Sequence, residues 1–357
     1  MQSRFGIFGV VASVAFAAAA CSSNKSEAAA PGTIEAPDAG AHPGSPKLAL
    51  DECGLHTAYA GDENCILPPP ADKGFQVHIG PADYDNPDEP YMLLPGEEKT
   101  TDFPAVSGND QKIFFFYRQY RLRPTAHHII LSTSNGSDVA SGRRIGTANR
   151  SQDFPVGGII APEDTGVGSP LDAHSPVNVS FHAINTTDKP GLREAWVNYW
   201  YRDASEVTEP ATEWFKTGDP LFTVQPHESK TLGPYTCNVQ GDGRMLWLYG
   251  HRHANNVRFT VTRVRGAQRD VIYDANKWDE PLLLEYSTLV ENAAPDPTQG
   301  LEGGWNGILD LATGDKVEWS CDVVNKNDTA LRFTNQTFLG EMCIVDAEAV
   351  GSTCSGL

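Results

Sequence analysis

The chain has 357 residues, of which 40% are hydrophobic, and its formal net charge is -19. This length allows two domains of ordinary size, or one domain with long tails. The strong negative charge argues against a protein that binds nucleic-acid backbones, which needs a basic face, so we expect no nucleic-acid partner.

The N-terminus predicts export. Arg4 precedes an apolar run from Phe5 to Phe16, which is too short to span a bilayer and is typical of a secretion signal over residues 1–20. The small residues directly before Cys21 resemble the lipobox of bacterial lipoproteins. This resemblance implies a lipid on Cys21 that anchors the chain to the bacterial cell envelope (periplasm, outer membrane or cell surface), with no other membrane contact. An ordinary signal peptide cleaved after alanine is the alternative.

A tether and a small staple should follow, together covering residues 21–72. Residues 22–49 are rich in Ala, Pro, Gly and Ser, which predicts a disordered tether. Cys53 and Cys65 bracket a short polar loop, and we expect them to join locally and fasten this segment to the first domain. With Cys21 set aside for the lipid, six of the seven cysteines remain, which predicts three disulfides in an oxidising compartment.

The rest of the chain predicts an all-β fold. Residues 75–79, 177–182 and 258–264 alternate between apolar and polar side chains, and residues 113–117 form a continuous apolar run of strand length. Short strands with frequent glycine and proline turns favour two tandem antiparallel β-sandwich (jelly-roll) domains. We place these domains at residues 73–212 and 213–357, with a polar break near residues 205–220.

Histidines supply the candidate metal ligands. In a strand, His251 and His253 would point to one face with Arg252 opposite, a geometry that suits two imidazoles on one metal. The adjacent His127 and His128 would point to opposite faces of a regular strand, so they can converge only at a strand end or a bulge.

Each of these patterns also has a purely structural interpretation. A His-x-His is often an exposed polar face, and a His-His pair often has one buried and one exposed ring. His182 ends the alternating run of residues 177–182 and lies on the polar face of that predicted strand. It could equally be a metal ligand that faces a cleft or a solvated surface residue. Most methionines are core filler, but the thioether of Met342 beside two imidazoles would favour Cu(I).

Four segments taken in order resemble the copper type II, ascorbate-dependent monooxygenases, the family of peptidylglycine α-hydroxylating monooxygenase and dopamine β-hydroxylase. The four segments are Thr125–Leu131 with its His-His pair, Phe181-His182, Cys237 followed by the His-x-His of residues 251–253, and Glu341-Met342-Cys343. The resemblance spans roughly residues 75–354. No single segment is specific to the family, and the resemblance is carried by the occurrence of all four segments in this order.

The resemblance implies two copper ions in two sites. The first would be held by three histidines and the second by two histidines and a thioether, namely His127, His128 and His182, and His251, His253 and Met342. It also implies the disulfides Cys237–Cys354 and Cys321–Cys343, the second of which would brace the loop that carries Met342. In the family the two coppers lie far apart across an open cleft.

The implied activity is hydroxylation of a C–H bond of a small substrate by O2, with ascorbate or a similar reductant as electron donor. The site of His251, His253 and Met342 would be catalytic, because its soft sulfur ligand favours Cu(I), and the three-histidine site would supply electrons. The peptide hydroxylase has an arginine two residues before its His-x-His. Here that residue is Tyr249, which with Trp247 favours a neutral or aromatic substrate.

Two other interpretations remain open from the sequence. A non-catalytic copper-binding or copper-delivery lipoprotein on the same scaffold would keep the same ligands. A metal-free tandem jelly roll acting as a hydrolase or an adhesin would instead scatter the six expected ligands in space, since a fold does not determine a function.

Overall fold

The structure is a computed structural model that describes residues 53–133, 143–155, 166–279 and 282–356. The expected signal peptide, the lipidated Cys21 and the tether over residues 22–49 lie outside the described residues. Among the helices of the described part, none is long and apolar enough to cross a membrane.

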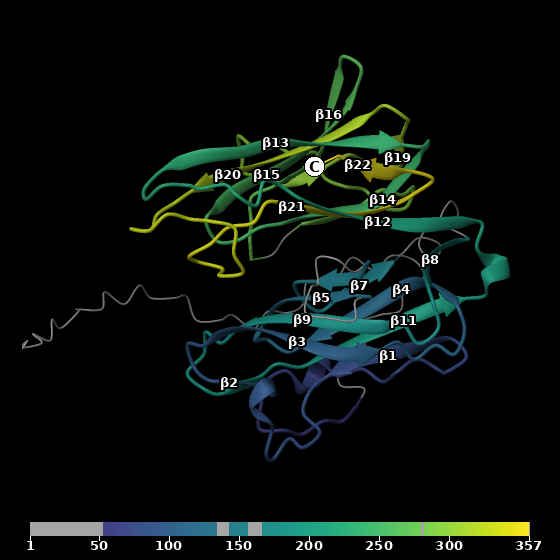
Figure 1. Ribbon diagram of the computed structural model, residues 1–357, viewed down its shortest axis with the longest axis vertical. Coiled ribbons are helices and arrows are strands. Elements are labelled where there is room, and N and C mark those ends of the chain that lie inside the picture. Colours follow the sequence, from purple (N-terminus) through teal and green to yellow (C-terminus); the bar gives the residue numbers. More distant parts are fainter. Residues whose placement is uncertain (1–52, 134–142, 156–165, 280–281, 357) are drawn as a thin grey trace, which may run out of the picture. The chain divides into compact units, whose positions relative to one another are not determined.

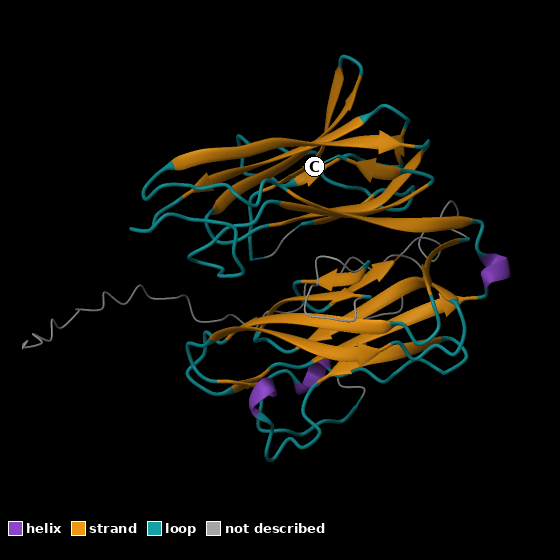
Figure 2. Ribbon diagram, in the orientation of Figure 1, coloured by secondary structure: helices purple, strands orange, loops and turns teal. Residues whose placement is uncertain are grey.

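Strands dominate the described chain, as Figure 2 shows. Three short 3-10 helices accompany them: η1 (Asp62–Asn64), η2 (Glu89–Tyr91) and η4 (Ala204–Glu206). The first set of strands comprises β1 (Gly74–Ile79), β2 (Met92–Leu93), β3 (Glu98–Val106), β4 (Ile113–Leu122), β5 (Ala126–Ser132), β6 (Arg144–Ala148), β7 (Gln152–Pro155), β8 (Val167–Leu171), β9 (Pro176–Ile184), β10 (Gly191–Leu192) and β11 (Ala195–Arg202).

The second set of strands comprises β12 (Glu209–Thr217), β13 (Ser229–Gln240), β14 (Gly243–His251), β15 (Asn256–Arg265), β16 (Gln268–Ala275), β17 (Leu283–Glu285), β18 (Gly303–Gly304), β19 (Leu309–Leu311), β20 (Lys316–Val324), β21 (Ile344–Val350) and β22 (Thr353–Ser355). We call β1–β11 the N-terminal sandwich and β12–β22 the C-terminal sandwich; Figure 1 labels most of their strands.

The N-terminal sandwich packs a four-stranded sheet, in the order β3-β9-β5-β6, against β1-β11-β4-β8. The predicted alternation in β9 is confirmed, because Val177, Val179 and Phe181 are buried in the core between the sheets. Phe103 of β3 meets Phe181 edge to face, with ring centroids 6.4 Å apart. The opposite side of β9 is therefore left for polar residues, among them His182.

The C-terminal sandwich packs a six-stranded sheet, in the order β18-β16-β15-β20-β13-β22, against β12-β21-β14-β17. Phe259 and Val261 of β15 are fully buried, as the alternation over residues 258–264 predicted. Together the two sandwiches confirm the predicted all-β class. Pairing between the named strands is antiparallel apart from one short parallel contact in the described part.

That parallel contact joins the sandwiches. β12 pairs with β21 along its length and, through Glu209 and Pro210, with β8, so one sheet runs from the N-terminal into the C-terminal sandwich. The predicted break at residues 205–220 is wrong over residues 209–217, because Trp214 is buried in the core and holds the segment as a strand. The expected domain boundary between residues 212 and 213 lies inside β12.

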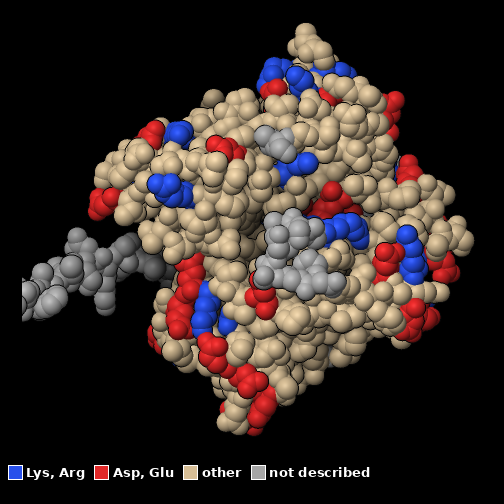
Figure 3. All heavy atoms as spheres, viewed as in Figure 1, with Lys and Arg blue, Asp and Glu red and all other residues tan. Residues whose placement is uncertain are grey.

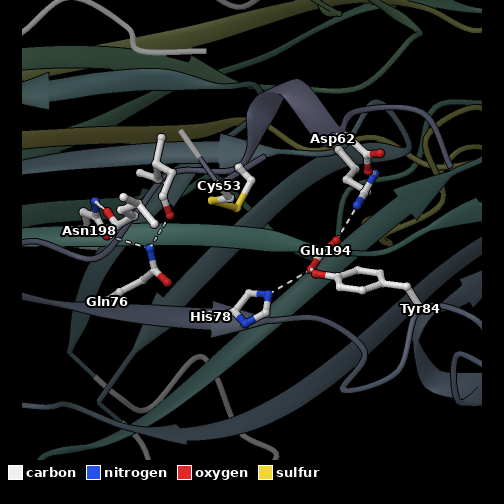
Figure 4. The surroundings of a disulfide bond; sticks show 11 residues. Cys53, Asp62, Gln76, His78, Tyr84, Glu194 and Asn198 are labelled. Atoms are coloured by element: carbon white, nitrogen blue, oxygen red, sulfur yellow. Dashed lines mark hydrogen bonds and ion pairs between the residues drawn. A yellow bond between two sulfur atoms is a disulfide. The ribbon is translucent and has the colours of Figure 1, made fainter. Parts of the chain in front are cut away.

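The segment before β1 is fastened as predicted. Cys53 and Cys65 form a disulfide and pack with Trp196 of β11. Figure 4 shows His78 and Tyr84 converging on the buried Glu194, whose Oε1 is 2.9 Å from His78 Nε2 and 2.6 Å from Tyr84 Oη. These contacts fasten the segment before β1, and the loop after it, to β11.

The other two disulfides also join the pairs that the resemblance implied. Cys237 of β13 bonds to Cys354 of β22, and Cys321 of β20 bonds to Cys343. The second bond closes 22 residues and ends directly beside Met342. Six of the seven cysteines are therefore paired, and the seventh is Cys21.

Candidate metal centre

The three histidines expected in the N-terminal sandwich come together on two neighbouring strands. β5 and β9 pair with His128 opposite His182, and the register shifts between Ala126 and His128. This bulge at His127 turns both rings of the pair toward His182, which a regular strand could not do. One ligand nitrogen from each of the three residues lies within 4.8 Å of the others.

Glu98 of β3 orients the third ring. Its Oε1 lies 2.9 Å from His182 Nε2 and also accepts a 2.9 Å hydrogen bond from the Thr337 backbone N–H. A proton on His182 Nε2 would be donated to this carboxylate, which leaves the Nδ1 lone pair free for a metal. Burial raises the pKa of Glu98, but the hydrogen bonds from Thr337 and His182 outweigh it and the net pKa is lowered.

The two histidines expected in the C-terminal sandwich also approach each other. His251 ends β14 and His253 follows two residues later, with ring centroids 5.4 Å apart. Arg252 between them points elsewhere: it is fully buried, donates a hydrogen bond to the Lys277 carbonyl and lies 3.8 Å from Glu302. The predicted alternation about Arg252 is therefore confirmed.

A buried carboxylate holds the Met342 loop beside His253. Glu341 Oε1 accepts hydrogen bonds from the backbone N–H of His253 at 2.6 Å and of Met342 at 2.8 Å. Burial raises the pKa of Glu341 to about 8, while these two donors act in the opposite direction. Together with the Cys321–Cys343 disulfide, this carboxylate fixes the chain that carries the thioether.

The two sets of ligands lie next to each other. The ring centroids of His128 and His251 are 4.8 Å apart, and those of His127 and His253 are 6.0 Å apart. This differs from the open cleft that the resemblance implied. The reason is that Trp247 of β14 packs with the core of the N-terminal sandwich, which brings the end of β14 against β5.

All five rings are neutral near pH 7. Burial, followed by the charge of His182, lowers the pKa of His127 to about 4, and burial lowers the pKa of His253 to about 3. Burial also puts the pKa values of His128 and His251 well below the ordinary value, and it lowers the pKa of His182 despite the carboxylate of Glu98. Neutral imidazole is the form that binds metals.

Several ring nitrogens of this cluster have no hydrogen-bond partner in the described part of the chain. They are buried and comprise His127 Nε2, His128 Nδ1, His182 Nδ1, His251 Nε2 and both ring nitrogens of His253. A buried polar atom without a partner is costly, and six of them in one cluster need an explanation. A bound metal ion is one that suits imidazoles, and with the thioether of Met342 nearby the donor set fits copper.

A cavity of about 330 Å³ opens beside the cluster. His128, His251 and Met342 form part of its wall, so both expected ligand sets border the same space. The remaining wall combines aromatic rings, hydroxyls, an amide and two charged groups: Phe215, Phe333, Tyr249, Thr100, Thr147, Ser180, Thr217, Asn335, Arg144 and Asp102, with Ile130 and Ile344. A cavity of this size next to ligand atoms suits a small organic molecule.

Three residues that matter here were not identified from the sequence. Glu98 and Arg144 stand in segments without any local motif; the pairing of β3 with the distant β9 brings Glu98 to the site, and the pairing of β6 with β5 brings Arg144 there. Trp278, whose ring centroid is 5.8 Å from that of His127, likewise lies far from it in the chain. Glu341 stood beside Met342 in the recognised segment, but only the structure reveals what its carboxylate contacts.

No protein-family model matches this chain, and no curated protein matches it. Among solved structures, it is similar to the STIV MCP, with 10% identity and a TM-score of 0.32 over 78% of this chain and 97% of that chain. It is also similar to the major capsid protein P2 from bacteriophage PM2, with 9% identity and a TM-score of 0.29 over 78% of this chain and 98% of that chain. Likenesses at this level say nothing about activity.

Proposed function

We propose that the protein is a copper- and O2-dependent monooxygenase that hydroxylates a C–H bond of a small substrate, with ascorbate or a similar reductant as electron donor. The observation that carries this proposal is the cluster of buried imidazoles with unpartnered nitrogens beside a cavity that Met342 also borders. The ordered resemblance to the copper monooxygenases supports the same assignment.

In this proposal, His127, His128 and His182 hold one copper and His251, His253 and Met342 hold the other. When bound, copper supplies the one-electron chemistry and the activation of O2 that no side chain can perform. The residues of the chain position these ions: Glu98 fixes the tautomer and orientation of His182, and Glu341 sets the position of Met342 against His253.

The cavity would place the substrate and keep water away from the reacting carbon. Its aromatic wall includes Tyr249, whose hydroxyl lies 3.2 Å from Thr147 Oγ1 and donates to Asn149 Oδ1 at 3.4 Å. These contacts fix the ring as part of the wall, so that it serves packing and orientation. The described contacts give Tyr249 no role in proton transfer.

The test separates an enzyme from a copper carrier on the same scaffold. We expect the copper-loaded chain to bind two ions and to consume O2 only when both ascorbate and a substrate are present. Met342→Ala should abolish this uptake and retain the copper of the three histidines, while Met92→Ala serves as the matched methionine control. Two bound ions with no turnover of any substrate would support delivery, and fewer than one ion per chain would overturn the copper assignment.

Export and lipid anchoring belong to the same proposal. The three disulfides favour an oxidising compartment, in agreement with the apolar N-terminal run and Cys21. Expressed in a bacterium, the full chain should partition with membranes, and Cys21→Ser should release it into the soluble exported fraction. Equal partitioning of the two proteins would contradict a lipid at Cys21.

A further inference from the structure

We propose that the cavity beside the histidine cluster binds a small organic monocarboxylic acid, whose carboxylate pairs with Arg144. This inference rests on the proposed function in taking the cavity as the substrate site. It replaces the neutral substrate expected from Tyr249 with an acid that carries an apolar or aromatic body.

Arg144 is the arginine among the residues that line the cavity, and no hydrogen-bond or ion-pair partner of its side chain is found in the described part of the chain. It begins β6, borders the cavity and lies with its guanidinium carbon 3.2 Å from the ring centroid of Phe215. Within the described residues its guanidinium makes neither a hydrogen bond nor an ion pair. Neighbouring arginines differ: Arg143 donates to Ser169 and to the Pro170 carbonyl, and Arg118 pairs with a carboxylate.

Stacking on Phe215 prepares this guanidinium for a planar partner. The guanidinium packs against this ring, and both residues line the cavity, so a ligand in the cavity can reach the N–H donors of Arg144. A carboxylate matches that edge with two parallel hydrogen bonds, which an ammonium ion or a neutral amide could not do equally well. Binding an acid would also give these half-buried donors an acceptor, which no described residue offers them.

The acidic groups that face Arg144 do not cancel its charge. Burial raises the pKa of Glu213 well above its ordinary value and the pKa of Asp346 to about 7, which weakens the negative charge around Arg144 near pH 7. Glu348, the third carboxylate of this region, accepts hydrogen bonds from Arg118 at 3.2 Å and from Trp247 at 3.0 Å. The positive charge of Arg144 therefore remains for a ligand.

The rest of the wall restricts the acid. Asp102, from β3, is the other charged group that borders the cavity and would repel a second carboxylate, which favours monoacids over diacids. Phe333 and Tyr249 offer apolar surface for the body of the ligand. Figure 3 shows acidic side chains gathered over the N-terminal sandwich, so attraction of the acid is local to the cavity and not a property of the whole surface.

The experiment compares phenylacetate with phenylacetamide, which has the same shape without the charge. Both are titrated by calorimetry into the full chain, once metal-free and once copper-loaded. We expect the acid to bind about tenfold to a hundredfold more tightly than the amide, as charge-assisted hydrogen bonds predict. Arg144→Gln should remove this preference, Arg144→Lys should keep part of it, and Arg269→Gln, on the surface, should leave it unchanged.

Equal affinities for acid and amide, an unchanged preference in Arg144→Gln, or no binding of phenylacetate would each overturn the proposal. The denaturation midpoint of Arg144→Gln, compared with that of the unsubstituted chain, verifies that the variant folds. The preference for the acid over the amide is also measured in the metal-free chain, so this test does not depend on copper binding. The copper assignment is tested separately, by metal stoichiometry and O2 uptake, and the two proposals can therefore fail independently.

Discussion

The rings of His128 and His251 meet edge to face with their centroids 4.8 Å apart, although His128 lies on β5 and His251 at the end of β14. They belong to the two different ligand sets that the resemblance implied. Their closeness makes each ring sensitive to the other: burial and then the charge of His251 lower the pKa of His128. The five rings therefore behave as one electrostatic group when no metal is present.

The metal-free chain should lose stability in acid because of these rings. Folding lowers the pKa of these histidines, so as the pH falls they take up a proton in the unfolded state before they do so in the folded state. Proton uptake stabilises the unfolded state, and the free energy of unfolding therefore decreases as the pH falls below about 6.5, the ordinary pKa of histidine. For His253 this loss continues down to the folded pKa of about 3, at up to about 1.4 kcal/mol per pH unit.

Comparing the unsubstituted chain with His253→Gln isolates the contribution of His253 to this pH dependence. Burial raises the pKa values of Glu341 and Asp346, so these groups make the folded state more stable as the pH falls, but they are present in both proteins and their contribution cancels in the comparison. Guanidinium denaturation of the metal-free proteins between pH 7.5 and 5 should therefore give a shallower pH dependence for the variant. Identical slopes would show that His253 is not held neutral by its surroundings.

Removing the carboxylate of Glu98 should weaken metal binding without removing a ligand. Glu98→Ala takes away the acceptor of His182 Nε2 and of the Thr337 N–H, so the ring loses its fixed tautomer and orientation. We expect a loss of roughly 10- to 100-fold in Cu(I) affinity, measured by competition with a chromophoric chelator. Glu98→Gln keeps an acceptor oxygen and should lose less, and Glu89→Ala, on the surface, should lose nothing.

Replacing Glu341 should loosen the thioether loop. Glu341→Ala leaves the backbone N–H groups of His253 and Met342 without their common acceptor, at about 1–3 kcal/mol for each buried donor. The expected result is a lower free energy of unfolding together with weaker Cu(I) binding. Glu341→Gln retains an acceptor oxygen and, like Glu341 below its pKa of about 8, carries no charge, so it is the matched control and should lose little; similar losses in both variants would contradict a role of these two hydrogen bonds.

The ion pair between Arg118 and Glu348 should be among the costliest to break. The two side chains are 2% and 1% exposed, their atoms are 3.2 Å apart, and Trp247 also donates to Glu348. Glu348→Gln removes the negative charge that pairs with this buried guanidinium, for which about 3–5 kcal/mol is expected in denaturation experiments. Glu318→Gln breaks the more exposed pair with Arg269 and should cost about 1 kcal/mol or less.

Much of the fold could be predicted because its signals are local. The alternation of apolar and polar residues in β9 predicted that Val179 and Phe181 are buried, and it predicted that His182 lies on the opposite face of the strand. The prediction failed at residues 209–217, where polar residues and a proline concealed a strand that Trp214 anchors in the core. Local polarity does not reveal whether a neighbouring strand offers a pairing edge.

The sequence by itself determined the strand pattern, the candidate ligands and, through the ordered resemblance, the pairing of the cysteines, because each of these depends on residue type and order along the chain. Only the tertiary structure decided that a bulge turns His127 and His128 together, that Glu98 supports His182, and that Arg144 borders the same cavity as Met342. These relationships join strands far apart in the chain, and they are set by which strands pair and which cores pack, which no local pattern encodes.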